Sequence, residues 1–104
     1  MTAMFVALST YLKPLDDVNA SRELHLKWIA DQFDSGHLLV SGRRNPAVGG
    51  VIVGRAADLE AFHALLADDP FVRAGLAHYD VVEFEPTAAA LDAPAFATFI
   101  GAGA

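Results

Sequence analysis

Four histidines, an aspartate that precedes a proline and a pair of adjacent arginines are the residues of this chain that can do chemistry. A histidine is the natural proton carrier near neutral pH, and a carboxylate bonded to its far nitrogen fixes the tautomer and stabilises the imidazolium ion. The chain contains no cysteine, which excludes disulfides, thiolate nucleophiles and zinc–thiolate sites. It also lacks a Gly-x-Ser-x-Gly motif, so we do not expect acyl-enzyme chemistry.

Asp69 stands at a turn between two predicted helical segments. The residue before a proline is pushed away from helical backbone angles, and Pro70 suits the first position of a new short helix. This geometry makes Asp69 an N-cap candidate, whose carboxylate accepts a backbone N–H of the following turn. Capping alone is one interpretation of Asp69, and a role in a functional site is the other.

His25 lies in a helix that the sequence predicts over residues 15–35, ended by Gly36. At about 100° per residue, one apolar stripe of this helix collects Val18, Leu26, Ile29, Ala30 and Phe33. His25 falls at the edge of the stripe, next to Ile29 and on the side of Trp28. Either the ring packs at a margin of the core with one nitrogen satisfied, or it faces a cleft.

Arg43 and Arg44 lie in a predicted loop over residues 42–50, between short strands at residues 37–41 and 51–54. The loop is longer than a tight hairpin needs, so we expect it to project as a flexible arm over a cavity at that end. There the two arginines are candidates for binding an anionic substrate group through forked hydrogen bonds. A solvated basic pair is the simpler alternative.

Composition argues against several other kinds of site. The histidines show neither His-x-His nor His-x-x-x-His spacing, and no glycine fingerprint for a dinucleotide is present. Seven basic residues against 13 acidic ones give a net charge of −6, the wrong sign for gripping a phosphate backbone. We therefore expect no metal, no cofactor and no nucleic-acid partner.

The first predicted strand, over residues 4–11, is apolar on both faces. One alternating set is Met4, Val6 and Leu8, and the other is Phe5 and Ala7. Helices are available for only one face of the sheet, and 104 residues leave no room for a second core. The other face needs a second sheet, which a partner copy supplies. Together with a hydrophobic content of 54%, this pattern predicts a homodimer.

The remaining elements complete a βαββαβ pattern, with a helix predicted over residues 57–67 and a last strand within residues 76–85. This is the order of the α+β, ferredoxin-like fold, an antiparallel sheet with two helices on one face. We place the domain at residues 1–86 and treat residues 87–104 as an apolar extension that packs on the domain or across the dimer. No apolar stretch approaches the about 20 residues that span a bilayer, so we expect a cytoplasmic protein without membrane contact.

Three stretches of the chain resemble the YciI-like family of dimeric α+β barrel proteins. They are Leu24-His25-Leu26-Lys27-Trp28, Gly36-His37-Leu38-Leu39-Val40-Ser41-Gly42 and Asp68-Asp69-Pro70-Phe71-Val72-Arg73-Ala74-Gly75-Leu76. The resemblance covers residues 4–86. The residue after Gly42 is usually proline in the family and is Arg43 here. This departure concerns the local loop and the pocket mouth rather than the fold.

The resemblance implies an active centre formed by a His–Asp pair, which by motif position falls on His25 and Asp69. It suggests an enzyme of the lyase or isomerase type, with His25 as base or acid, that acts on a small polar or ring-containing molecule. The expected substrate-binding residues are Trp28, Ser41, Arg43 and Arg44. A non-catalytic ligand-binding dimer and a purely structural interaction module are the alternatives, because one fold hosts many functions.

Overall fold

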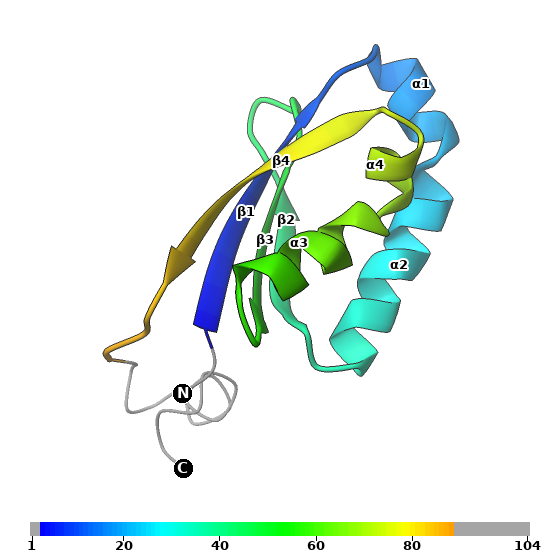
Figure 1. Cartoon of the computed structure of the whole chain (residues 1–104). Coiled ribbons are helices and arrows are strands. Elements are labelled where there is room, and N and C mark those ends of the chain that lie inside the picture. The colour runs from blue at the N-terminus through cyan, green and yellow to red at the C-terminus, as the bar shows by residue number, and fades with distance from the viewer. Residues whose placement is uncertain (1–2, 89–104) are drawn as a thin grey trace.

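The computed structural model describes residues 3–88, which form a four-stranded antiparallel sheet with helices on one face (Figure 1). The strands are β1 (Ala3–Tyr11), β2 (Leu38–Arg43), β3 (Gly50–Ala56) and β4 (Ala77–Phe84). They follow the order β2-β3-β1-β4, so the apolar first strand is central and pairs with β3 and β4. The predicted α+β, ferredoxin-like arrangement is confirmed. The predicted extension at residues 87–104 lies almost entirely outside the described residues.

Each of the two crossovers contains two helices. They are α1 (Leu15–Ala20) and α2 (Arg22–Asp34) in the first crossover, and α3 (Leu59–Ala67) and α4 (Pro70–Arg73) in the second. The single helix predicted over residues 15–35 is wrong at Ser21, whose φ of −108° and ψ of 5° interrupt it. The Ser21 N–H bonds to the Val18 carbonyl, three residues back, as in a tightened last turn. None of the helices within residues 3–88 has the length and hydropathy of a membrane span.

The face of α2 that points to the sheet differs from the predicted stripe. Trp28 and Ile29 are buried, whereas Leu26 and Phe33 are 56% and 40% exposed. His25 shares the buried face with Trp28 and Ile29, because these residues stand at positions i, i+3 and i+4. His25 therefore lies on the inner side of the helix rather than at the edge of its apolar stripe.

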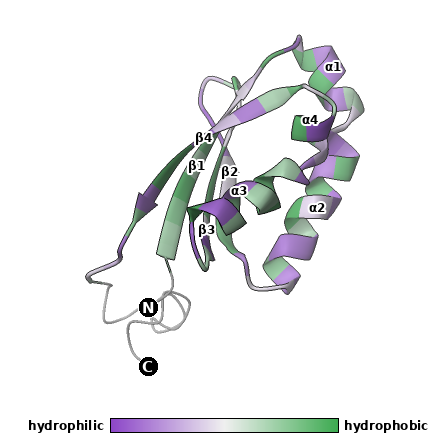
Figure 2. Cartoon of the chain, in the orientation of Figure 1, coloured by the Kyte–Doolittle hydropathy of each residue, from purple (hydrophilic) through white to green (hydrophobic). Residues whose placement is uncertain are grey.

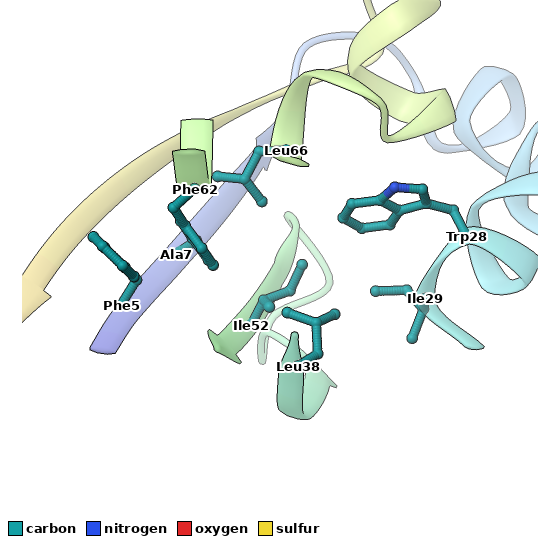
Figure 3. Close-up of a cluster of buried hydrophobic side chains, with 8 residues drawn as sticks. All are labelled: Phe5, Ala7, Trp28, Ile29, Leu38, Ile52, Phe62 and Leu66. Carbon is teal, nitrogen blue, oxygen red and sulfur yellow. The ribbon is translucent and has the colours of Figure 1, made fainter. Parts of the chain in front are cut away.

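The main hydrophobic core lies between the sheet and the helices (Figure 3). Phe5 of β1 stacks on Phe62 of α3, with ring centroids 4.5 Å apart. Figure 2 shows that β1 is hydrophobic along most of its length, as the central strand of such a core requires. The other buried members of the cluster are Ala7, Trp28, Ile29, Leu38, Ile52 and Leu66. In Figure 3 the Trp28 indole extends from α2 into this cluster, toward Leu66.

A second cluster packs α1 and α4 against the start of β4. Its buried members are Val18, Phe71, Leu76 and Ala77, and Tyr11 packs against them. The rings of Tyr11 and Phe71 meet edge to face, with centroids 6.0 Å apart. This cluster fixes α4, and with it the turn at Asp69, over one end of the sheet.

The sheet face opposite the helices carries a row of valines. Val6 of β1 pairs with Val53 of β3 and with Val82 of β4, and Val53 pairs with Val40 of β2. Val40 and Val82 are 51% and 58% exposed, and the nearby Phe84 is 39% exposed. All the helices of the described residues lie on the other side of the sheet (Figure 1), so no helix covers this valine row.

The loop between β2 and β3 consists of residues 44–49, which makes it shorter than predicted. It is also bonded to the end of β1. The Tyr11 N–H donates to the Val48 carbonyl at 2.8 Å, and Arg44 Nη1 donates to the Ser9 carbonyl at 3.2 Å. The loop therefore lies along β1 instead of projecting as a flexible arm.

Gly49 allows this close approach, and its replacement gives a test of the loop's attachment. A Cβ at Gly49 would lie 1.8 Å from the Ser9 carbonyl oxygen, far closer than the two atoms can approach without a clash. We expect Gly49→Ala to push the loop away from β1 and to lower the free energy of unfolding by about 1–3 kcal/mol. Gly42→Ala is the control, because its Cβ would meet nothing within 4 Å. Urea unfolding measures both variants, and equal stabilities would contradict the attachment.

Candidate active site

The carboxylate of Asp69 joins three elements of the fold. Its Oδ1 lies 2.7 Å from Nδ1 of His25 on α2 and accepts the backbone N–H of Phe71 on α4 at 2.9 Å. Its Oδ2 accepts the hydroxyl of Tyr79 on β4 at 2.6 Å. The side chain is completely buried. Asp69 therefore caps α4 and also contacts His25, so capping is not the only contact that its carboxylate makes.

The contact with Asp69 fixes the tautomer of the His25 ring. An ionised carboxylate only accepts hydrogen bonds, so the short contact places the proton on Nδ1. The ring also stacks face to face on Phe71, with centroids 4.0 Å apart and planes 5° from parallel. Among residues 3–88 no hydrogen bond reaches Nε2, and the side chain keeps 15% of its surface exposed. Nε2 is thus the nitrogen left to meet a ligand.

Tyr79 supports the carboxylate from the sheet side. Burial, the negative charge of Asp69 and the hydrogen bond between them raise the pKa of Tyr79 far above its ordinary value of about 10. The hydroxyl therefore stays protonated and donates to Asp69 at any physiological pH. With one oxygen bonded by Tyr79 and the other shared by His25 and the Phe71 N–H, the carboxylate has little freedom to turn.

A cavity of about 200 Å³ opens beside His25. Its walls come from β1, α2, the facing ends of β2 and β3, α4 and β4. The lining residues that matter here are Tyr11, Arg22, His25, Ser41, Arg43 and Tyr79. The volume is below the about 300–1,000 Å³ of sites for drug-sized ligands, so the cavity suits a molecule with a single ring.

The structure brings two of the four expected substrate-binding residues to this cavity. Ser41 and Arg43 line it, whereas Arg44 and Trp28 do not. Arg44 is turned toward β1, where Nη1 also donates to Thr10 Oγ1 at 3.2 Å. Trp28 is 8% exposed and belongs to the core, with its ring centroid 6.1 Å from that of His25. Its role is packing beside the site rather than contact with a ligand in the cavity.

Sequence reasoning missed Arg22, the first residue of α2. Its Nε donates to Asn19 Oδ1 at 2.9 Å, and its Nη2 donates to the Tyr11 hydroxyl at 3.4 Å. The guanidinium carbon lies 5.8 Å from the centroid of the Phe71 ring, on which His25 is also stacked. A signal was present in the sequence, because Arg22 stands three residues before His25 and so shares its helix face.

This arrangement can move a proton and stabilise negative charge. Nε2 of His25 can accept or donate a proton at the cavity, and Asp69 offsets the positive charge of the imidazolium. The guanidinium groups of Arg22 and Arg43 can face an anion. No group of three or more potential metal ligands from His, Cys, Asp and Glu lies together in the part of the chain that the structure describes.

One protein family and two solved structures are similar to this chain. The family described as the YCII-related domain matches residues 4–85. Among solved structures, the dehydrochlorinase for 5-chloro-2-hydroxyhydroquinone from Burkholderia phenoliruptrix AC1100, in complex with 2,5-dihydroxybenzoquinone, matches with a TM-score of 0.67 and 18% identity, over 78% of this chain and 92% of that chain. A mutant of SnoaB, a cofactor-independent oxygenase from Streptomyces nogalater, matches with a TM-score of 0.48 and 17% identity. The match covers 86% of this chain and 97% of that chain. A search of curated proteins found no match.

The hydrogen bond from Tyr79 to Asp69 predicts a loss of stability in Tyr79→Phe. The substitution keeps the ring but leaves Asp69 Oδ2 without its donor. We expect the free energy of unfolding at neutral pH to fall by about 0.5–1.5 kcal/mol, or somewhat more because the acceptor is buried. Urea unfolding at pH 7 measures the difference, and an unchanged midpoint would argue against the bond.

The raised pKa of Tyr79 also predicts a difference in pH dependence. Above pH 10 or so the unfolded chain loses a phenol proton that the folded protein keeps, so this contribution to stability is complete below that pH and declines above it, by up to about 1.4 kcal/mol per pH unit. Other groups titrate in the same range, so the readout is the difference between wild type and Tyr79→Phe. Parallel pH profiles for the two proteins would contradict the shift.

Proposed function

The chain belongs to the YCII-related domain family over residues 4–85, and from this premise we propose that it is an enzyme of the lyase or isomerase type that moves protons on a small polar or ring-containing molecule. The observation that carries the proposal is the 2.7 Å contact between His25 Nδ1 and Asp69 Oδ1 beside a cavity of about 200 Å³. A buried carboxylate behind a partly exposed imidazole is the arrangement that general acid–base catalysis uses.

In the proposed reaction, Nε2 of His25 takes a proton from the substrate. The bonding electrons of that C–H or O–H group then expel a leaving group from a neighbouring atom, or they shift along the substrate to a new position. In an isomerisation the imidazolium returns the proton at the new position, and in an elimination it gives the proton to the leaving group or to water. Asp69 stabilises the imidazolium throughout, while Tyr79 and the Phe71 N–H hold the carboxylate in place.

The size of the cavity and one structural neighbour suggest which molecules to test first. The cavity suits one ring. The neighbouring dehydrochlorinase with a TM-score of 0.67 is described with a hydroxylated aromatic substrate and a bound dihydroxybenzoquinone. For this chain we therefore propose small phenols, quinols and lactones as the first panel.

Replacing His25 tests the proposed reaction. With a substrate from this panel, we expect His25→Ala to lower turnover by about 10²–10⁴-fold, which is the usual contribution of a positioned acid or base. His63→Ala is the matched control, because His63 is exposed on α3 and does not line the cavity. Unchanged turnover in His25→Ala would contradict the assignment. Binding of panel members without any turnover would favour the non-catalytic ligand-binding module.

We also propose that the protein is a homodimer in which the valine row of one copy packs on that of the other. Val40 and Val82 leave an apolar face of the central sheet exposed, and no described helix covers it. A second sheet packed about 10 Å away would remove these side chains from water. We propose a second copy as the partner because the row crosses all four strands and is apolar, so it is complementary to itself, as an isologous interface requires.

Light scattering tests the dimer. We expect the wild type at micromolar concentration to have twice the mass of the chain, and Val82→Lys to shift it toward the monomer because the lysine would place a charge in the interface. Leu24→Lys is the control, since Leu24 is similarly exposed, at 61%, but lies on α2 on the other side of the sheet. A monodisperse monomer in the wild type would contradict the proposal.

A further inference from the structure

Two arginines that line the cavity, Arg22 and Arg43, are not needed for proton transfer by His25. Arg22 and Arg43 line the cavity, and both also line an adjoining hollow of about 220 Å³. Tyr11 is the third residue common to the two hollows. The two arginines, one from the start of α2 and one from the end of β2, therefore lie where the cavity beside His25 meets its neighbour.

Acidic side chains do not offset this charge. Within the described residues, neither hollow is lined by an aspartate or a glutamate. Asp69 lies behind His25, is completely buried and already accepts three hydrogen bonds. The chain as a whole has a net charge of −6, so two unopposed cations at a cavity are a local exception. Two cations without nearby acidic groups produce a positive electrostatic field that attracts an anionic ligand to this part of the cavity.

The bonding of the two arginines leaves their charges available. Arg22 is oriented by two neutral groups, the Asn19 side chain and the Tyr11 hydroxyl, and lies over the Phe71 ring. Arg43 is exposed, and within residues 3–88 its side chain forms no hydrogen bond or ion pair. By contrast Arg73, on the outer surface, is paired with Asp68 at 3.0 Å.

We propose that Arg22 and Arg43 form a subsite for a carboxylate, so that the ligand of the cavity is a small molecule with one ring and one carboxylate group. Guanidinium groups bind carboxylates through paired, charge-assisted hydrogen bonds. The carboxylate lies between the two arginines, and the ring extends toward Nε2 of His25. The placement of the ring beside His25 rests on the proposed function. Binding of the carboxylate by the arginines does not depend on it, because binding requires no turnover.

The test uses two probes of nearly the same shape, the anionic hydroxybenzoate gentisate and its neutral amide. Dissociation constants are measured by calorimetry for the wild type, Arg22→Gln, Arg43→Gln and Arg73→Gln. We expect the wild type to prefer the acid by about tenfold or more, and each cavity variant to weaken binding of the acid by about ten- to hundredfold while leaving the amide unchanged. Arg73→Gln removes the same charge from the surface and should bind both probes like the wild type.

Equal binding of the acid and the amide would overturn the subsite, and so would a preference that survives Arg43→Gln or an acid that fails to bind at about 10 mM. Arg43 is exposed, so its variant keeps the test valid even if Arg22→Gln impairs folding. His25-dependent turnover of a neutral quinol, together with equal binding of the acid and the amide, would overturn the subsite and leave the proposed function standing. Arginine-dependent binding of carboxylates without any turnover would support the subsite and contradict the enzyme.

Discussion

A buried carboxylate that accepts three hydrogen bonds is the interaction on which the arrangement of this protein depends. Transfer of a carboxylate from water to a protein interior costs several kcal/mol, and close donors must offset that cost. Asp69 finds them in an imidazole, a backbone N–H and a phenol. These donors come from α2, α4 and β4, so the carboxylate specifies how the two helices and the strand lie relative to each other. The group that orients His25 also holds the fold around it.

Most of the fold follows from local patterns that the sequence shows openly. The two-sided apolar strand β1 had to be central, and it lies between β3 and β4. Pro70 after Asp69 predicted a new helix with an aspartate cap, and Asp69 does accept the Phe71 N–H. These features could be predicted because each depends on neighbouring residues or on simple alternation.

The break between α1 and α2 could not be predicted in the same way. A serine is only slightly less favourable in a helix interior than other ordinary residues, so the residue type at Ser21 does not mark the break that its backbone angles show. Within α2 the buried residues are Trp28 and Ile29, so the predicted stripe was misplaced. Trp28 was expected at the site although it packs in the core, and Arg22 was overlooked although it lines the cavity.

The positions of the remaining side chains near the site depend on where the strands end and on which way each strand residue faces. β2 continues to Arg43, which keeps that side chain at the cavity, and the chain turns at Arg44, whose side chain bonds to β1. Tyr79 had a signal in the sequence, because the polar residues His78 and Asp80 flank it on β4 and alternation turns it toward the helices. Its hydrogen bond to Asp69 connects β4 with the start of α4, and this contact could not be predicted from the sequence of either element.

The attachment of the 44–49 loop to β1 affects how such a site can change. Enzymes often acquire new specificities by lengthening surface loops, whose ordering entropy grows slowly with length. Here Gly49 lies too close to the Ser9 carbonyl to admit a side chain, and Val48 is bonded to Tyr11. The wall of the cavity is therefore ordered before a ligand arrives, and an inserted residue would undo that preorganisation. Diversification of this site should proceed by exchange of single side chains at the strand end, such as Arg43, within a backbone of constant length.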